Sequence, residues 1–196
     1  MVLSIQETGE ATLNNKTLSG LPENLDLPRY DRRQLTAGII HIGVGNFHRA
    51  HLAWYVHRLM QQGLAHDWGI IGAGVRPQDS LMRERLLKQD CLTSLIELDP
   101  QGSQSFEVTG AMLDFLPVDL DNHSLIQALA DPQIRIVSLT ITEGGYYLDV
   151  TSNALDTAHP DIIHDAKYPD TPRTAFGAMV AALRLRRDQG LGPFTG

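Results

Sequence analysis

The sequence predicts an α/β protein with a mostly parallel sheet and helices on both faces. Short apolar runs, several of them rich in β-branched residues, alternate along the chain with stretches of helical periodicity. Strands that alternate with helices favour parallel pairing, because a crossover helix returns the chain to the end of the sheet where the previous strand began. The apolar run over residues 38–43 also ends in a glycine turn that leads directly into a helical pattern.

Composition narrows the classes of protein to which this chain can belong. Its 196 residues are enough for a sizeable core, and 42% hydrophobic with 20% charged residues is ordinary for a globular protein. A net charge of -7 without a basic stripe argues against a nucleic-acid partner. The single Cys91 fits a reducing compartment, and there is neither a secretory leader nor an apolar run of the ~20 residues that span a bilayer. We therefore expect a cytoplasmic protein with no membrane partner.

The first half of the chain is expected to hold an arm and the first strands. Residues 1–37 are weakly periodic and are interrupted by Pro22 and Pro28, which indicates an N-terminal arm. The run 38–43 is the first predicted strand, and the helix after it is expected to end near Gly63. The next predicted elements are a strand over 68–73, a helix over 77–89, and two strands over 91–98 and 105–108 around a turn.

The second half is expected to continue one domain, over residues 38–196, that is incomplete. Asn122 caps a short predicted helix, and the branched apolar run 134–141 predicts a central strand. Residues 150–172 are polar and are expected to be irregular. The last predicted helix, over 172–189, has an apolar stripe formed by Phe176, Met179, Val180 and Leu183. The residues after it are typical of the lead-in to another strand, so we expect a sheet truncated before its last strands.

The turn after the first strand has the form G-x-G-x-x-H, with glycines at Gly43 and Gly45 and a histidine at His48. A strand, a glycine turn and a helix in this order present backbone N–H groups to a phosphate in dinucleotide-binding, Rossmann-like sheets. Such folds often carry a third glycine where His48 stands, so this helix is expected to pack differently on its strand. The same spacing also suits a plain turn between a strand and a helix.

Polar residues follow two other predicted strands, where an open sheet places its ligands. Thr142 and Glu143 come after the 134–141 strand and could contact a nicotinamide ribose, although Glu143 could equally be a solvated residue beside a turn. Asp79 follows the second strand and favours the ribose of NAD, whereas Arg76 leaves NADP open. Capping of the first helical turn is the alternative role of Asp79.

The chain also contains four histidines close together in sequence, at His41, His48, His51 and His57. Zinc needs three or four ligands, and no Cys pair or well-spaced carboxylate completes such a set, so we expect no metal site. There is no P-loop, no G-x-S-x-G elbow and no Tyr-x-x-x-Lys pair, and we name no catalytic residue. Arg49 either lies near a pyrophosphate or pairs with a carboxylate on the surface.

Two motifs resemble the long-chain mannitol dehydrogenase family. They are residues 42–51, Ile-Gly-Val-Gly-Asn-Phe-His-Arg-Ala-His, and residues 137–146, Val-Ser-Leu-Thr-Ile-Thr-Glu-Gly-Gly-Tyr. Segments 68–76 and 174–177 look like family segments too. The resemblance implies a Rossmann-like NAD-binding domain and an enzyme that interconverts a polyol and a ketose, typically D-mannitol and D-fructose, without a metal. Sister branches reduce fructuronate or tagaturonate, so a hexuronate reductase is the alternative, as is a nucleotide-binding remnant without activity.

The resemblance also assigns candidate cofactor-binding residues by position. Around the pyrophosphate they are Ile42, Gly43, Val44, Gly45, Asn46, Phe47, His48 and Arg49. Asp79 would meet the adenosine ribose, and Thr142 and Glu143 would lie near the nicotinamide. The family's catalytic lysine lies in a helical C-terminal substrate domain with no counterpart in this sequence, so this chain alone is expected to be inactive. The oligomeric state stays open.

Overall fold

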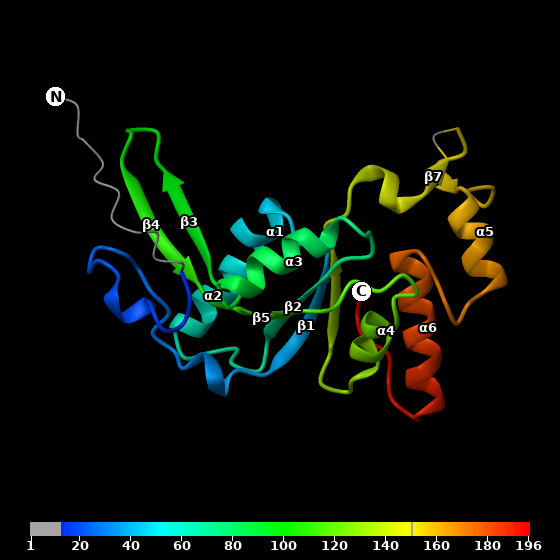
Figure 1. Ribbon diagram of the computed structural model, residues 1–196, viewed down its shortest axis with the longest axis horizontal. Helices are drawn as coiled ribbons and strands as arrows, with labels where there is room; N and C mark the ends of the chain where they lie inside the picture. Colours follow the sequence, from blue (N-terminus) through cyan, green and yellow to red (C-terminus); the bar gives the residue numbers. More distant parts are fainter. Residues whose placement is uncertain (1–12, 150) are drawn as a thin grey trace.

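Four parallel strands form the central sheet (Figure 1). The structure is a computed structural model that describes residues 13–149 and 151–196. In chain order the strands are β1 (Ala37–Ile42), β2 (Gly69–Ala73), β5 (Met112–Phe115) and β6 (Ile136–Leu139). In space they run β5-β2-β1-β6, and all three neighbouring pairs are parallel. The predicted mostly parallel sheet is confirmed, and the strand order reverses between β1 and β6.

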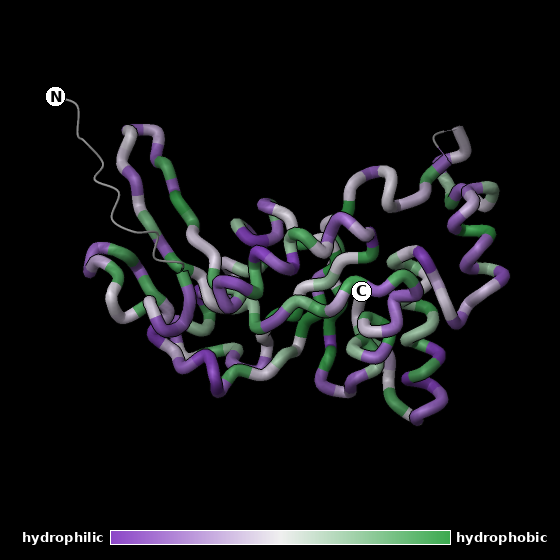
Figure 2. The backbone as a smooth tube through the Cα atoms, in the orientation of Figure 1, coloured by the Kyte–Doolittle hydropathy of each residue, from purple (hydrophilic) through white to green (hydrophobic). Residues whose placement is uncertain are grey.

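Helices cover both faces of this sheet, because alternate residues of β1 enter two separate cores. On one face Ile39 packs with residues of α2 (Leu52–Gln61) and α3 (Asp79–Lys88). On the other face Ile40 and Ile42 pack with residues of α4 (His123–Ala130) and α6 (Ala175–Asp188). Strands β1 and β2 are hydrophobic along most of their length in Figure 2, as expected for strands buried on both faces.

The helix expected after the first strand is divided in two. α1 (Asn46–Ala50) is followed by α2, and the break lies at His51, whose φ of -122° and ψ of -86° are not helical. The His51 amide still reaches the Phe47 and His48 carbonyls, so the chain turns without leaving those groups unpaired. Apolar periodicity runs across the break, which is why the sequence pattern does not reveal it.

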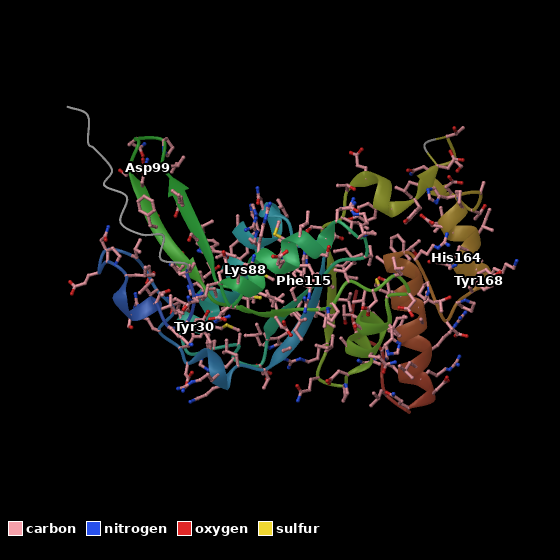
Figure 3. All side chains as sticks on the ribbon, in the orientation of Figure 1. Tyr30, Lys88, Asp99, Phe115, His164 and Tyr168 are labelled. Atoms are coloured by element: carbon pink, nitrogen blue, oxygen red, sulfur yellow. The ribbon has the colours of Figure 1, made fainter. Side chains whose placement is uncertain are left out.

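A separate antiparallel hairpin projects from the body of the molecule. Its strands are β3 (Thr93–Leu98) and β4 (Gln104–Thr109), as the sequence predicted. Asp99 lies at the tip of the hairpin in Figure 3, and its carboxylate accepts the Gln101 and Ser103 amides at 2.9 and 2.7 Å. This local bonding closes the turn.

The segment before β1 packs against that hairpin and against α2. It contains two short 3-10 turns, η1 (Leu18–Gly20) and η2 (Arg32–Gln34), and Asp26 forms a parallel bridge to Glu107 of β4. The Tyr30 hydroxyl lies 2.6 Å from Nδ1 of the buried His57. Residues 1–12 of the predicted arm lie outside the described residues, and the predicted boundary between residues 37 and 38 stays a prediction.

Two further regions of the chain depart from the sequence expectation. Strand β5 was not predicted, because it is short and carries Asp114 within an otherwise apolar run. Residues 150–172 were expected to be irregular, yet they contain the short strand β8 (Ala154–Leu155) and the helix α5 (Pro160–Lys167). β8 pairs with β7 (Leu148–Asp149) in a small hairpin beyond the main sheet. Pro160 at the first position of α5 is the helix-start signal in this polar stretch.

α6 buries a different face from the predicted one. Val180 and Leu183 of the expected apolar stripe are exposed, whereas Ala178 and Ala182 are fully buried. Small side chains let α6 approach α4 closely, which larger ones would prevent. After α6 the chain returns to the sheet, where Thr195 forms a parallel bridge with Ile136. Within the part of the chain that the structure describes, no helix has the length and apolar character to cross a bilayer.

Candidate functional site

A cleft of about 880 Å³ opens at the carboxyl ends of the parallel strands. Ile42 and Gly43 line it from the end of β1, Asp79 from the segment after β2, and Thr142 from the segment after β6. The order β5-β2-β1-β6 places the reversal of the chain between β1 and β6, beneath this cleft. Open α/β sheets bind their ligands in the crevice above such a reversal.

The glycine turn at the end of β1 needs glycine at Gly43 and leaves space at Gly45. Gly43 has a φ of +91°, and a Cβ there would lie 2.7 Å from the Thr140 carbonyl oxygen. The Gly45 amide donates to the Gly43 carbonyl at 2.8 Å and closes the turn. A Cβ at Gly45 would meet nothing within 4 Å, so the backbone there is open to an approaching group.

Of the residues expected at this turn, Ile42 and Gly43 line the cleft, whereas Gly45 and the others lie around it. Val44 is buried in the core, and the His48 side chain is fully buried. Asn46 and Phe47 are exposed. The Arg49 guanidinium donates to the Asn46 side-chain oxygen and, through Nε at 3.4 Å, to the Gly45 carbonyl. A ligand over the turn would thus meet backbone atoms and the exposed side chains, and it would not reach the His48 ring.

Asp79 lines the cleft and also holds the loop that precedes its own helix. One carboxylate oxygen accepts the amides of Val75 and Arg76 at 3.1 and 3.0 Å. The other oxygen lies 3.9 Å from the half-exposed Arg76 guanidinium, which also lines the cleft. Asp79 stands in the first turn of α3, but its hydrogen bonds go to amides of the loop before the helix, and α3 has no side-chain cap.

The expected nicotinamide end is formed by a tight turn after β6. Thr142 precedes the 3-10 turn η3 (Glu143–Tyr146), and its carbonyl accepts the Gly145 amide at 2.7 Å. Thr142 lines the cleft, and Glu143 is exposed next to it. The structure thus brings Gly43, Asp79 and Thr142, which lie far apart in the chain, to one cleft.

Sequence reasoning missed two walls of the cleft. Asp119 and Asp121 line it after β5, and Asp161 and His164 line it from α5. The first pair could have been found only by recognising β5, since polar residues after a parallel strand face the ligand edge. The second pair follows the helix start at Pro160.

α5 is held against the start of α6 by one carboxylate. Asp165 accepts the Arg173 amide at 2.7 Å and the Thr174 hydroxyl at 2.7 Å, and Thr174 in turn caps α6 by accepting the Gly177 amide. Although partial burial favours the neutral acid, these amides and the hydroxyl hold the pKa of Asp165 below its usual value. The α5 wall is therefore tied to the helix that packs on the sheet.

The four histidines singled out in the sequence do not converge on one point. His41 and His48 stack on each other with 3.6 Å between ring centroids, and His51 stacks on Phe47. His57 lies 3.1 Å from a Glu107 carboxylate oxygen. Across residues 13–149 and 151–196, no group of three His, Cys, Asp or Glu side chains is placed to hold a metal ion.

Comparisons with known proteins agree with this architecture. The chain is 61% identical over 168 residues to a mannitol 2-dehydrogenase of Cereibacter sphaeroides, and the match covers 86% of this chain and 35% of that protein. It is 43% identical to a polyol:NADP oxidoreductase of Gluconobacter oxydans, with 93% and 38% covered. The chain thus spans little more than a third of the length of these relatives.

A solved structure has the same fold. The Pseudomonas fluorescens mannitol 2-dehydrogenase, in a ternary complex with NAD and D-mannitol, superposes with a TM-score of 0.88 at 43% identity, over 93% of this chain and 37% of that chain. The family described as the mannitol dehydrogenase Rossmann domain matches residues 37–195. The resemblance that the sequence motifs indicated is confirmed, and the chain belongs to the mannitol dehydrogenase family through its Rossmann domain.

Proposed function

We propose that this chain is the NAD-binding part of an oxidoreductase that interconverts D-mannitol and D-fructose. The observation that carries the proposal is the cleft above the strand reversal, which Gly43, Asp79 and Thr142 line from three different strand ends. The relatives point the same way, because they are named as mannitol 2-dehydrogenases and one of them is described with NAD and D-mannitol.

The residues at this cleft and in the adjoining glycine turn fit a dinucleotide in their chemistry. The pyrophosphate would lie over the Gly43–Gly45 turn, where the open space at Gly45 lets an anion approach the backbone. Asp79 would accept hydroxyl groups of the adenosine ribose, and Thr142 and Glu143 would lie at the nicotinamide end. When bound, NAD supplies the acceptor for a hydride. The part of this chain is to bind and orient the cofactor above the sheet.

NAD, rather than NADP, is the proposed cofactor. A carboxylate beside the ribose accepts its two hydroxyls and repels a 2′-phosphate, and we assign this role to Asp79, which lines the cleft. Arg76 lies beside it and could favour a 2′-phosphate, and one relative is named as a polyol:NADP oxidoreductase. Because the Asp79 oxygen that accepts neither amide lies 3.9 Å from the Arg76 guanidinium, the carboxylate offsets much of the positive charge of Arg76.

Titration of NADH fluorescence with the purified chain tests the proposal. We expect saturable binding, tighter for NADH than for NADPH, and a loss on the order of tenfold or more in Gly45→Ala. The added methyl group meets no protein atom, and the φ of -102° suits alanine, so the fold is expected to be unchanged. Gly20→Ala is the matched control, since its Cβ also points into open space but far from the cleft.

Two outcomes would overturn the proposal. If the folded, monodisperse chain does not bind NADH at all, NAD is not its cofactor. Equal NADH affinities for Gly45→Ala and Gly20→Ala would remove the glycine turn as its binding site.

A further inference from the structure

His41 connects the two strands between which the sheet reverses. It lies on β1, and its side chain is 1% exposed. Its Nδ1 atom lies 2.8 Å from the Ser138 hydroxyl, and its Nε2 atom lies 2.8 Å from the Thr140 hydroxyl. Ser138 is the direct partner of His41 in the β1–β6 register, so one ring spans two positions of the neighbouring strand. None of these three side chains lines the cleft itself.

The hydrogen bonds of this group have only one consistent direction. The Thr140 hydroxyl lies 2.8 Å from the Gly43 carbonyl oxygen, and a carbonyl can only accept, so Thr140 donates to it. The Thr140 oxygen is then the acceptor for His41, which must carry its proton on Nε2. Nδ1 is left with its lone pair and accepts the Ser138 hydroxyl. The series of hydrogen bonds therefore runs from Ser138 through His41 and Thr140 to Gly43.

The surroundings keep His41 in the neutral form that this chain requires. Burial lowers the pKa of His41 to about 4 and outweighs the Gly43 backbone, which acts in the opposite direction. At neutral pH the imidazole therefore has one N–H and one lone pair. Hydrogen bonds that point one way along a buried chain polarise one another, which strengthens the last bond to Gly43.

The Gly43 carbonyl, at which this series of hydrogen bonds ends, belongs to the Gly43–Gly45 turn. The Gly43 oxygen accepts both the Thr140 hydroxyl and the Gly45 amide, each at 2.8 Å, and the Gly43 amide donates to Ala73 at 2.9 Å. The Gly43 peptide groups are thus held by β2, by Thr140 directly after β6, and by the turn itself. A φ of +91° is a conformation that glycine reaches easily but also leaves easily, so an external hold is needed to keep it.

We propose that His41 and Thr140 are positioning residues, which act through the Gly43 carbonyl to hold the Gly43–Gly45 turn ready for a dinucleotide pyrophosphate. This inference rests on the proposed function. Because the turn is already ordered in the free protein, no conformational entropy has to be lost from the turn when the cofactor binds. Loss of the hydrogen bond from Thr140 to the Gly43 carbonyl weakens the affinity for the cofactor, although no atom that touches the cofactor is removed.

The test compares Thr140→Val with Thr140→Ser. Valine has the shape of threonine but no hydroxyl, and serine keeps the hydroxyl. We expect Thr140→Val to weaken NADH binding by about fivefold to tenfold, the value of one well-placed hydrogen bond, and Thr140→Ser to stay within about twofold of wild type. Thermal melts accompany both titrations, because a purely structural role for Thr140 would lower the melting temperature without separating the two affinities.

The tautomer of His41 is a second readout that does not depend on the cofactor. Long-range ¹H–¹⁵N correlation spectra of the wild-type chain are expected to show a protonated Nε2 and an unprotonated Nδ1 for His41. Ser138→Ala removes the first donor away from the turn. This variant is expected to weaken the preference of His41 for a proton on Nε2, and to reduce NADH affinity by less than Thr140→Val does. The role of these hydrogen bonds can therefore still be tested if the valine variant does not fold.

The possible failures can be told apart. Failure of the wild-type chain to bind NADH would overturn the proposed function and this inference with it. Wild-type binding with an unchanged affinity in Thr140→Val, or a His41 ring protonated on Nδ1, would overturn the positioning role alone. A serine variant as weak as the valine variant would also overturn it, since the hydroxyl would then not be the group that matters.

Discussion

The ring of His48 lies stacked on the ring of His41, with 3.6 Å between centroids and 15° between their planes, beneath the glycine turn of the cleft. Both rings are buried, and within the described residues neither nitrogen of His48 has a hydrogen-bond partner. Burial lowers the pKa of His48 to about 3 and that of His41 to about 4. The pair is therefore neutral in the folded protein at physiological pH.

The pH dependence of stability follows from this pair. In the unfolded chain both histidines have a pKa of about 6.5, and in the folded chain burial lowers both pKa values. Unfolding therefore takes up protons below a pH of about 6.5. The stability they contribute is complete above pH of about 6.5 and is lost as the pH falls toward about 4. Each histidine is expected to lower the free energy of unfolding by up to about 1.4 kcal/mol per pH unit.

Urea unfolding between pH 8 and pH 5 measures this slope. His57 adds to it in the same direction, because burial lowers its pKa as well. His51→Gln is the control, since it removes an exposed histidine and leaves the stacked pair in place. A free energy of unfolding that is constant from pH 7 to pH 5 would contradict the neutral buried pair.

A second prediction concerns the buried Arg186. Its guanidinium donates to the carbonyls of Leu129, Asp131 and Ile134 and to that of Gly192, and so joins α4, the segment before β6 and residue 192 to α6. Arg186→Met leaves these carbonyls without their donor and is expected to cost about 3 kcal/mol or more of unfolding free energy.

The neighbouring arginine provides the matched control for that experiment. Arg187 is exposed and pairs only with the adjacent Asp188 among the described residues. Arg187→Met is expected to change the free energy of unfolding by less than about 1 kcal/mol. Similar losses in the two variants, measured by urea unfolding, would show that the carbonyl network of Arg186 contributes little.

A third prediction separates the two roles of Asp79. Asp79→Ala removes both the acceptor of the Val75 and Arg76 amides and the proposed ribose acceptor. We expect weaker NADH binding, and a shift of preference toward NADPH because Arg76 is then unopposed. Arg76→Ala in the same background should remove the gained NADPH affinity. An unchanged ratio of NADH to NADPH affinities in Asp79→Ala would rule out the ribose role.

A fourth prediction tests which face of α6 is buried. Ala178 is fully buried and Val180 is 47% exposed, on the same helix. Ala178→Leu is expected to destabilise the protein by about 1 to 3 kcal/mol through overpacking against α4 and the sheet. Val180→Leu, which introduces the same residue two positions away, should stay within about 0.5 kcal/mol of wild type. The opposite order in urea unfolding would restore the stripe predicted from sequence.

Features that depend on a few neighbouring residues were predictable. Gly43 requires a left-handed backbone at the end of an apolar run, and that local demand is visible in the sequence as strand, glycine and helix. The hairpin around Asp99 was predictable for the same reason, since its turn is closed by bonds within five residues. The strand β5 was not, because its burial depends on β2 and its own residues carry a charged side chain.

The sequence by itself determined the α/β class, the parallel strands, the glycine turn and the family, because periodicity, turn residues and motifs are local properties of the chain. The tertiary structure decided which face of α6 is buried, where the cleft lies, and that His41 reaches Thr140 across a separation of 99 positions. Those relationships arise from packing and from hydrogen bonds between distant segments, and no local pattern specifies them.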